Sequence, residues 1–66
     1  MEWVADTVTP RSIHCVIKQD TRAGYYLFVW EDGLGIADDL QDDLETAMDV
    51  AFERFNVPKE AWRQVE

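Results

Sequence analysis

The sequence predicts an α+β fold, a small antiparallel sheet packed by one amphipathic helix. Two observations support this prediction. Residues 42–55 place apolar side chains every three or four positions, the spacing of a helix with one buried face. Residues 12–19 and 25–31 are instead rich in β-branched and aromatic side chains, and the segment between them ends in glycine, as in a β-hairpin. At 66 residues, the chain is expected to form a single domain, residues 1–66.

The helix predicted over residues 42–55 has signals at both ends. Asp42 can cap the first turn, with Glu45 three residues later in the capping-box position. At the other end, Asn56 can adopt the left-handed conformation that stops a helix, and Pro58 prevents continuation. The predicted buried stripe consists of Leu44, Ala47, Met48, Ala51, Phe52 and Phe55.

The predicted hairpin has apolar side chains on both faces. In residues 12–19, one face carries Ile13, Cys15 and Ile17, and the other carries His14, Val16 and Lys18. In residues 25–31, one face carries Tyr25, Leu27 and Val29, and the other carries Tyr26, Phe28 and Trp30. Because one helix covers only one face of a sheet, a second cover is required. Three covers are available: the C-terminal segment, the N-terminal residues around Trp3, or a second copy of the chain.

The remaining segments are predicted from shorter patterns. Residues 2–8 have the composition of an N-terminal edge strand. Ile36 and Ala37 either form a short third strand or lead into the helix. A short C-terminal helix is predicted over residues 58–64, because proline is favoured at the first helical position, and its Trp62 is expected to close the core.

The charge of the chain is strongly negative and uneven. Fourteen Asp and Glu residues face six Lys and Arg residues, giving a net charge of −8 at pH 7. Residues 1–30 and 50–66 are each balanced, so the whole excess lies in residues 31–49, which contain no Lys or Arg. Such a block repels nucleic acid and anionic lipid. We therefore expect no nucleic acid and no membrane as partner, but a basic protein or none.

Six acids form the first candidate partner-binding site: Asp38, Asp39, Asp42, Asp43, Glu45 and Asp49. An ordinary explanation is that acids at a helix start cap the helix and interact favourably with its dipole. Glu45 and Asp49, however, repel each other at four-residue spacing, and the absence of an interleaved lysine favours a positive partner. The spacing of the acids does not match a calcium-binding loop, so no metal site is predicted.

The sequence contains no catalytic or cofactor motif, so we expect neither enzyme activity nor a cofactor. His14 and Cys15 are neighbours on a predicted strand and therefore point to opposite faces. With one cysteine and one histidine, zinc binding is implausible, and Cys15 is expected to be a small core residue. The lone cysteine and a start without a charged and then apolar leader predict an unprocessed cytoplasmic protein.

The aromatic residues form the second candidate site. The Trp, Tyr and Phe residues outside the helix exceed what one sheet face over one helix needs, although small cores also use large residues to gain buried area. Tyr26, Phe28 and Trp30 would form the exposed or dimer-forming stripe, so we expect a homodimer.

The predicted function is therefore a small acidic protein-interaction or accessory module. The alternative is an inhibitor or immunity-like protein whose acidic surface binds a basic target or mimics nucleic acid. This alternative predicts binding that weakens as ionic strength rises.

Overall fold

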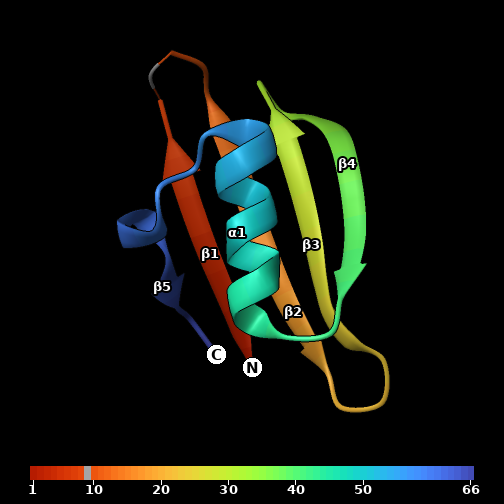
Figure 1. The fold of residues 1–66 in the computed structure, drawn as a ribbon. Helices are drawn as coiled ribbons and strands as arrows, with labels where there is room; N and C mark the ends of the chain where they lie inside the picture. Colours follow the sequence, from red (N-terminus) through yellow and green to blue (C-terminus); the bar gives the residue numbers. More distant parts are fainter. Residues whose placement is uncertain (9) are drawn as a thin grey trace.

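The computed structural model describes residues 1–8 and 10–66, and they form one antiparallel sheet with a helix across it (Figure 1). The predicted α+β fold is confirmed. The strands follow the order β4-β3-β2-β1-β5 across the sheet. The elements in chain order are β1 (Glu2–Thr7), β2 (Ile13–Asp20), β3 (Gly24–Glu31), β4 (Leu34–Gln41), the helix α1 (Leu44–Phe55), the 3₁₀ helix η1 (Lys59–Ala61) and β5 (Arg63–Gln64).

The central hairpin of β2 and β3 agrees with the prediction to within a residue or two at each end. Val16 lies opposite Phe28 in the middle of the hairpin, and Asp20 lies opposite Gly24 next to the turn. The Asp20 carboxylate organises this turn by accepting hydrogen bonds from the backbone N–H groups of Arg22 and Ala23, at 2.9 and 3.1 Å. A short polar side chain that bonds to the backbone ahead of it stabilises a turn in this way.

The strand β4 is longer than the sequence analysis predicted. It spans eight residues and pairs with β3 along its whole length, with an irregularity in register between Val29 and Trp30. Asp32 and Gly33, with φ of 50° and 82°, form the two-residue turn before it. Positive φ at both positions is the conformation of the tight hairpin turn that Asp-Gly favours. Leu34 then pairs directly with Glu31, which fixes the start of the strand.

The helix α1 begins at Leu44, two residues after the start of the predicted range, and its cap is one residue later than predicted. Asp43, not Asp42, is the N-cap, and its carboxylate accepts a hydrogen bond from the Thr46 N–H at 2.8 Å. The predicted stop at Asn56 is confirmed, because its φ of 59° is left-handed. Only one position of the predicted stripe is wrong. Phe52 is 51 % exposed, because successive helical residues are rotated by about 100° and the buried face is centred on Ala51.

The short C-terminal helix predicted over residues 58–64 is confirmed only as a single turn, and its predicted extent is wrong. The helical part is only the three residues of η1, after which Trp62 is extended and β5 pairs with β1. Hydrogen bonds between Glu2 and the last two residues extend this contact, including one from the Val65 N–H to the Glu2 carbonyl at 2.8 Å. The strand β1 is present as predicted, but β5 flanks it, so β1 is not the edge of the sheet.

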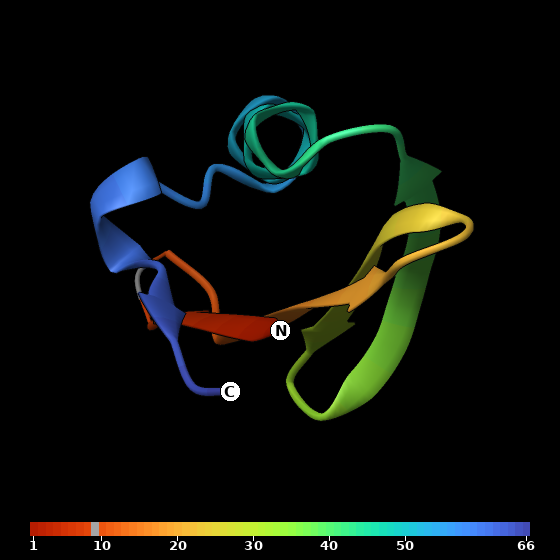
Figure 2. The same ribbon diagram turned by 90° about the horizontal axis from the view of Figure 1, so that it is seen from below.

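The core lies between α1 and one face of the sheet, which we call the inner face. Its fully buried side chains come from the middle three strands, from α1 and from the segment after it: Ala5, Cys15, Ile17, Leu27, Val29, Ala47, Ala51 and Val57. Trp3 packs on the same side, with its ring centroid 6.0 Å from that of Tyr25, and Trp62 packs against the same cluster. Figure 2 shows α1 and η1 on this side of the sheet and no helix on the other.

Two of the three predicted covers for the second face are therefore wrong. The N-terminal Trp3 and the C-terminal Trp62 both close the inner core, so within the described chain neither covers the opposite face. Strand alternation directs Trp3 of β1 toward the helix. Trp62 is the extended residue between η1 and β5, and it packs against the same inner core. No helix in the described part of the chain is long and apolar enough to cross a membrane.

Candidate functional site

The sheet face opposite α1, which we call the outer face, is the largest candidate site. Alternation along the strands places every second side chain on it. Its members are Glu2, Val4 and Asp6 of β1, His14, Val16 and Lys18 of β2, Tyr26, Phe28 and Trp30 of β3, Asp38 and Leu40 of β4, and Arg63 of β5.

The register of the strands arranges these side chains in three rows across the sheet. The central row runs from Arg63 through Val4, Val16 and Phe28 to Asp38. The second row consists of Glu2, Lys18, Tyr26 and Leu40. The third row consists of Asp6, His14 and Trp30, which ends opposite Gly35. The central row is therefore apolar or aromatic between two charged ends, whereas the other two rows have one charged end on β1 and carry Lys18 or His14 beside the aromatic ring of β3.

The aromatic side chains of β3 form a continuous ladder along the outer face. The ring centroid of Phe28 lies 6.1 Å from that of Tyr26 and 6.2 Å from that of Trp30, and the His14 ring lies 5.5 Å from Trp30. These aromatic rings are half-buried, and Val16 beside them is only 7 % exposed, although no described element covers this face. The structure thus places the predicted aromatic residues together on an uncovered surface.

Two shallow hollows lie on this surface, on either side of Phe28. The first is lined by Tyr26, Phe28, Asp38, Asp39 and Leu40, and the second by Phe28, Trp30, Gly35, Ile36, Ala37 and Asp38. Ile36 and Leu40 are both exposed, and aromatic rings form the opposite wall of each hollow. The two hollows share Phe28 and Asp38, so an apolar ring and a carboxylate stand side by side between them.

A polar group occupies the third row. The Nδ1 atom of His14 lies 2.6 Å from Oδ1 of Asp6, and the other carboxylate oxygen of Asp6 lies 4.0 Å from the Arg63 guanidinium. His14 therefore has a carboxylate on one side and the Trp30 ring on the other. All three polar side chains are about half exposed or more, so water remains free to reach them.

The six predicted acidic residues do not form one site. Asp39 pairs with Arg54 at 2.9 Å, and Lys59 lies 2.6 Å from Asp49 and 3.7 Å from Glu45. Lys59 therefore offsets the repulsion between Glu45 and Asp49, so this pair needs no cation from a partner. The hydrogen bond that the Lys59 ammonium donates to the Asp49 carboxylate raises the pKa of Lys59 above its ordinary value.

The other three acids also have separate environments. Asp43 caps α1, and the hydrogen bond from the Thr46 backbone lowers the pKa of its carboxyl group. Asp42 is exposed in the connection before the helix, and Asp38 lies on the outer face. Within the described residues, neither Asp38 nor Asp42 has an ion-pair partner. Of these acids, Asp38 lies in a row of the outer face beside Phe28, while Asp39 borders the first hollow and is paired with Arg54.

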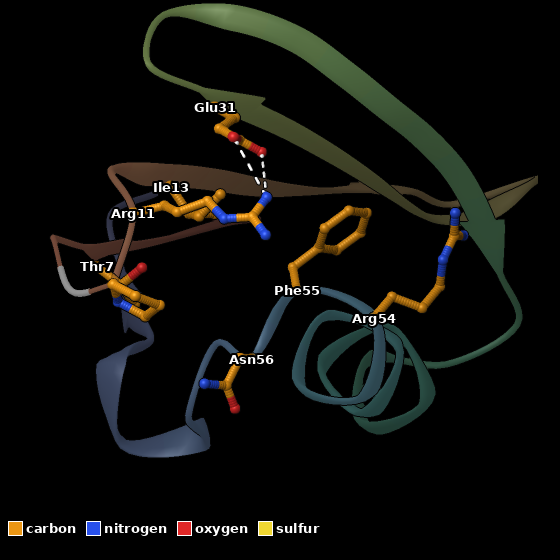
Figure 3. Close-up of a pocket in the computed structure, with 8 residues that line it drawn as sticks. Thr7, Arg11, Ile13, Glu31, Arg54, Phe55 and Asn56 are labelled. Atoms are coloured by element: carbon orange, nitrogen blue, oxygen red, sulfur yellow. Dashed lines mark hydrogen bonds and ion pairs between the residues drawn. The ribbon is translucent and has the colours of Figure 1, made fainter.

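A separate cleft lies between the C-terminal end of α1 and the connection from β1 to β2 (Figure 3). Its volume is about 150 Å³, against roughly 300 Å³ for the smallest usual ligand pockets. Figure 3 shows Arg11 directed at Glu31, with Phe55 between Arg11 and Arg54. One guanidinium nitrogen of Arg11 contacts both carboxylate oxygens of Glu31, at 3.2 and 3.3 Å. This cleft is small, and its two cations are already paired, Arg11 with Glu31 and Arg54 with Asp39, so it is a weaker candidate than the outer face.

Cys15 and His14 lie on opposite faces, as the alternation predicts. Cys15 is fully buried in the inner core, whereas His14 is exposed on the outer face. The described residues contain no group of three or more His, Cys, Asp or Glu side chains that could hold a metal ion. Burial, and to a lesser degree the charge of Asp6, raises the pKa of the Cys15 thiol to about 12 from its ordinary value of 9.0. The thiol is therefore neutral and inaccessible in the folded chain.

This thiol should make folding stability depend on alkaline pH. In the unfolded chain Cys15 ionises near its ordinary pKa of 9.0, while in the folded chain it stays protonated until about pH 12. Its contribution to the free energy of unfolding is thus constant below pH 9 and decreases as the pH rises toward 12. Urea unfolding between neutral pH and about pH 11 should show this decrease relative to Cys15→Ala, which retains both tyrosines. Parallel pH profiles for the two chains would contradict it.

Comparison of the chain with models of known protein families, with curated proteins and with solved structures found no match.

Proposed function

We propose that the chain is a protein-interaction module, that its docking surface is the outer face, and that the partner on this face is a second copy. The observation that carries the proposal is the aromatic ladder of Tyr26, Phe28 and Trp30, which no described element of the chain covers. Large aromatic side chains are enriched at the centres of protein interfaces, where they bury much area at little entropic cost. No catalytic activity is part of this proposal.

The small size of the chain supports the same conclusion. A domain of about 60 residues buries only about 60 % of its unfolded surface, so covering a second sheet face adds a large fraction of its stabilising contacts. Trp3 and Trp62, the aromatic residues nearest the chain ends, are already used in the inner core. Of the three covers considered for the second sheet face, a second copy of the chain is the one that remains.

The dimer should be reversible. Four strands spaced about 4.8 Å apart and about six residues long give a footprint of roughly 400 Å² in projection, which corresponds to the smaller protein interfaces. Interfaces this small belong to weak and transient associations. We therefore expect monomers and dimers to coexist, with the dimer favoured as concentration rises.

The acidic surface receives less support as the docking site. Asp39, Asp49 and Glu45 are paired with cations of the chain, and Asp43 serves as a helix cap. The inhibitor or immunity-like alternative predicts capture of a basic protein that weakens steeply with added salt. Contact through the outer face is centred on apolar and aromatic side chains, so it should weaken less steeply with salt than capture by acidic groups alone. The cytoplasmic location stays a prediction, in keeping with the buried free thiol of Cys15.

A substitution on the outer face should separate association from folding. We expect Trp30→Ser or Phe28→Ser to weaken self-association by at least about tenfold, because each removes a central aromatic ring from the interface. The matched control is Phe52→Ser, which removes an aromatic ring that is 51 % exposed on α1. Light scattering after size-exclusion chromatography measures association, and circular dichroism verifies that each variant is folded. The proposed surface would be refuted if all three substitutions weakened self-association equally, or if only Phe52→Ser weakened it.

A further inference from the structure

The outer face carries opposite charges at its two edges, in the same cross-strand row. Asp38 lies on β4 beside Phe28, and no cationic side chain of the described residues is within ion-pair distance of its carboxylate. Arg63 lies on β5 beside Val4, and its guanidinium is 4.0 Å from Asp6, at the outer limit of an ion pair. A lone carboxylate next to an aromatic docking surface loses hydration when that surface is covered, so its partner must supply a positive group.

We infer that two copies pack their outer faces together about a twofold axis that runs parallel to the strands, between β2 and β3. In this arrangement Arg63 of each copy pairs with Asp38 of the other. The inference rests on the proposed self-association and adds its geometry and the two residues that set it. A twofold axis makes the contact self-complementary, so each such pair forms twice.

This rotation keeps every row in place and reverses the order of the strands. β3 then lies over β2 of the second copy. Each aromatic ring of β3 therefore faces one side chain of β2, which is aliphatic in the central row, cationic in the second row and an imidazole in the third. The facing pairs are Phe28 with Val16, Trp30 with His14, and Tyr26 with Lys18. Aliphatic contact, ring stacking and a cation over an aromatic ring are all favourable. Strand directions of the two sheets remain within about 30° of each other, as in other face-to-face sheet packings.

The same rotation brings the charged edges together. β4 lies over β1 of the second copy, and β5 of that copy is one strand spacing, about 4.8 Å, further out. A guanidinium on the long side chain of Arg63 can cross this distance to Asp38, and its planar donors suit a carboxylate. Arg63 is well exposed, so its side chain is free to turn from Asp6 toward the second copy.

The other in-plane twofold axis, perpendicular to the strands, gives a much poorer match. It keeps the strand order and reverses the rows, so the Asp38 carboxylates of the two copies face each other across the axis. It also places Glu2 over Asp6, and these two acids repel. Like charges that face each other in an interface disfavour the arrangement strongly. Charge complementarity therefore selects the axis parallel to the strands.

A charge exchange between the two edges tests this geometry. Arg63→Glu and Asp38→Lys should each raise the dimer dissociation constant at least about tenfold, because each places two like charges together twice in the dimer. The double variant Arg63→Glu/Asp38→Lys restores opposite charges and should return the constant to within about threefold of the unmodified chain. Arg22→Glu and Asp42→Lys, at exposed positions away from the outer face, make the same charge changes as controls.

Sedimentation velocity over a concentration series gives the dissociation constant for each chain, and circular dichroism verifies folding. Loss of the dimer in both single variants, with recovery in the double variant, supports the inference. A dimer that both single variants retain, or that the double variant does not recover, overturns the geometry and leaves the proposed self-association intact. An unmodified chain that is monomeric throughout overturns both.

Discussion

Replacing Leu27 with alanine should unfold most of the protein at room temperature. Leu27 is 1 % exposed at the centre of the inner core, and removing a buried leucine side chain costs about 2–5 kcal/mol. A single core in a chain of this length supplies about 3–5 kcal/mol of net stability, so the loss is comparable with the whole. Urea unfolding followed by tryptophan fluorescence measures the change.

Leu34→Ala is the matched control for this prediction. Leu34 is 70 % exposed at the start of β4, so the same chemical change there should alter the free energy of unfolding by no more than about 0.5 kcal/mol. Equal costs at the two positions, or a cost at Leu27 below about 1 kcal/mol, would mean that α1 does not pack on this face of the sheet.

The second large effect is expected from Gly24→Ala. Gly24 has φ of 124°, and a Cβ atom built there would lie 2.3 Å from the backbone carbonyl oxygen of Gln41. Rotating a side chain relieves neither the positive φ at residue 24 nor the contact with the Gln41 carbonyl, because both involve the backbone. The start of β3 must therefore move away from the end of β4. A strained backbone alone costs about 1–3 kcal/mol, and the displacement adds to that cost.

Gly33→Ala separates the two contributions. Gly33 also has positive φ, 82°, but a Cβ atom there would meet no other atom within 4 Å. It should therefore cost only the conformational penalty, about 1–2 kcal/mol, whereas Gly24→Ala should cost at least about 2 kcal/mol more. Thermal unfolding of the two variants under the same conditions gives the comparison. Similar midpoints would show that the chain does not approach Gly24 as closely as described.

The central hairpin and the helix could be predicted because each has a strong local period. Alternation in residues 12–19 and 25–31, and the stripe of α1, are set by neighbours along the chain. The strand β4 was harder to predict, because Gly35, Asp38 and Asp39 are poor strand formers and pairing with β3 overrides their preference. The Asp32-Gly33 dipeptide was the signal that identifies this second hairpin.

The end of the chain could not be predicted for a related reason. Pro58, Ala61 and Trp62 suit a short helix, but β1 offers an open edge to which the last residues bind through backbone hydrogen bonds. The availability of that edge depends on how the whole sheet is ordered. A local pattern contains no information about it.

The candidate site could be predicted only in part for the same reason. Alternation alone places Tyr26, Phe28 and Trp30 on one face, and the structure agrees. It does not show that Asp38 and Arg63 end the row through Phe28, because that row crosses all five strands. The cations that neutralise the acidic segment were missed as well, since they come from positions distant in the sequence or on another element.

Sedimentation equilibrium of the unmodified chain, from about 10 μM to about 1 mM, tests directly whether a second copy covers the outer face. The predicted result is an average mass that rises from that of one chain toward that of two, with Trp30→Ser needing at least about tenfold higher concentration to reach the same mass. A mass of one chain at every concentration would contradict the proposal, because the aromatic ladder would then face water in the native protein.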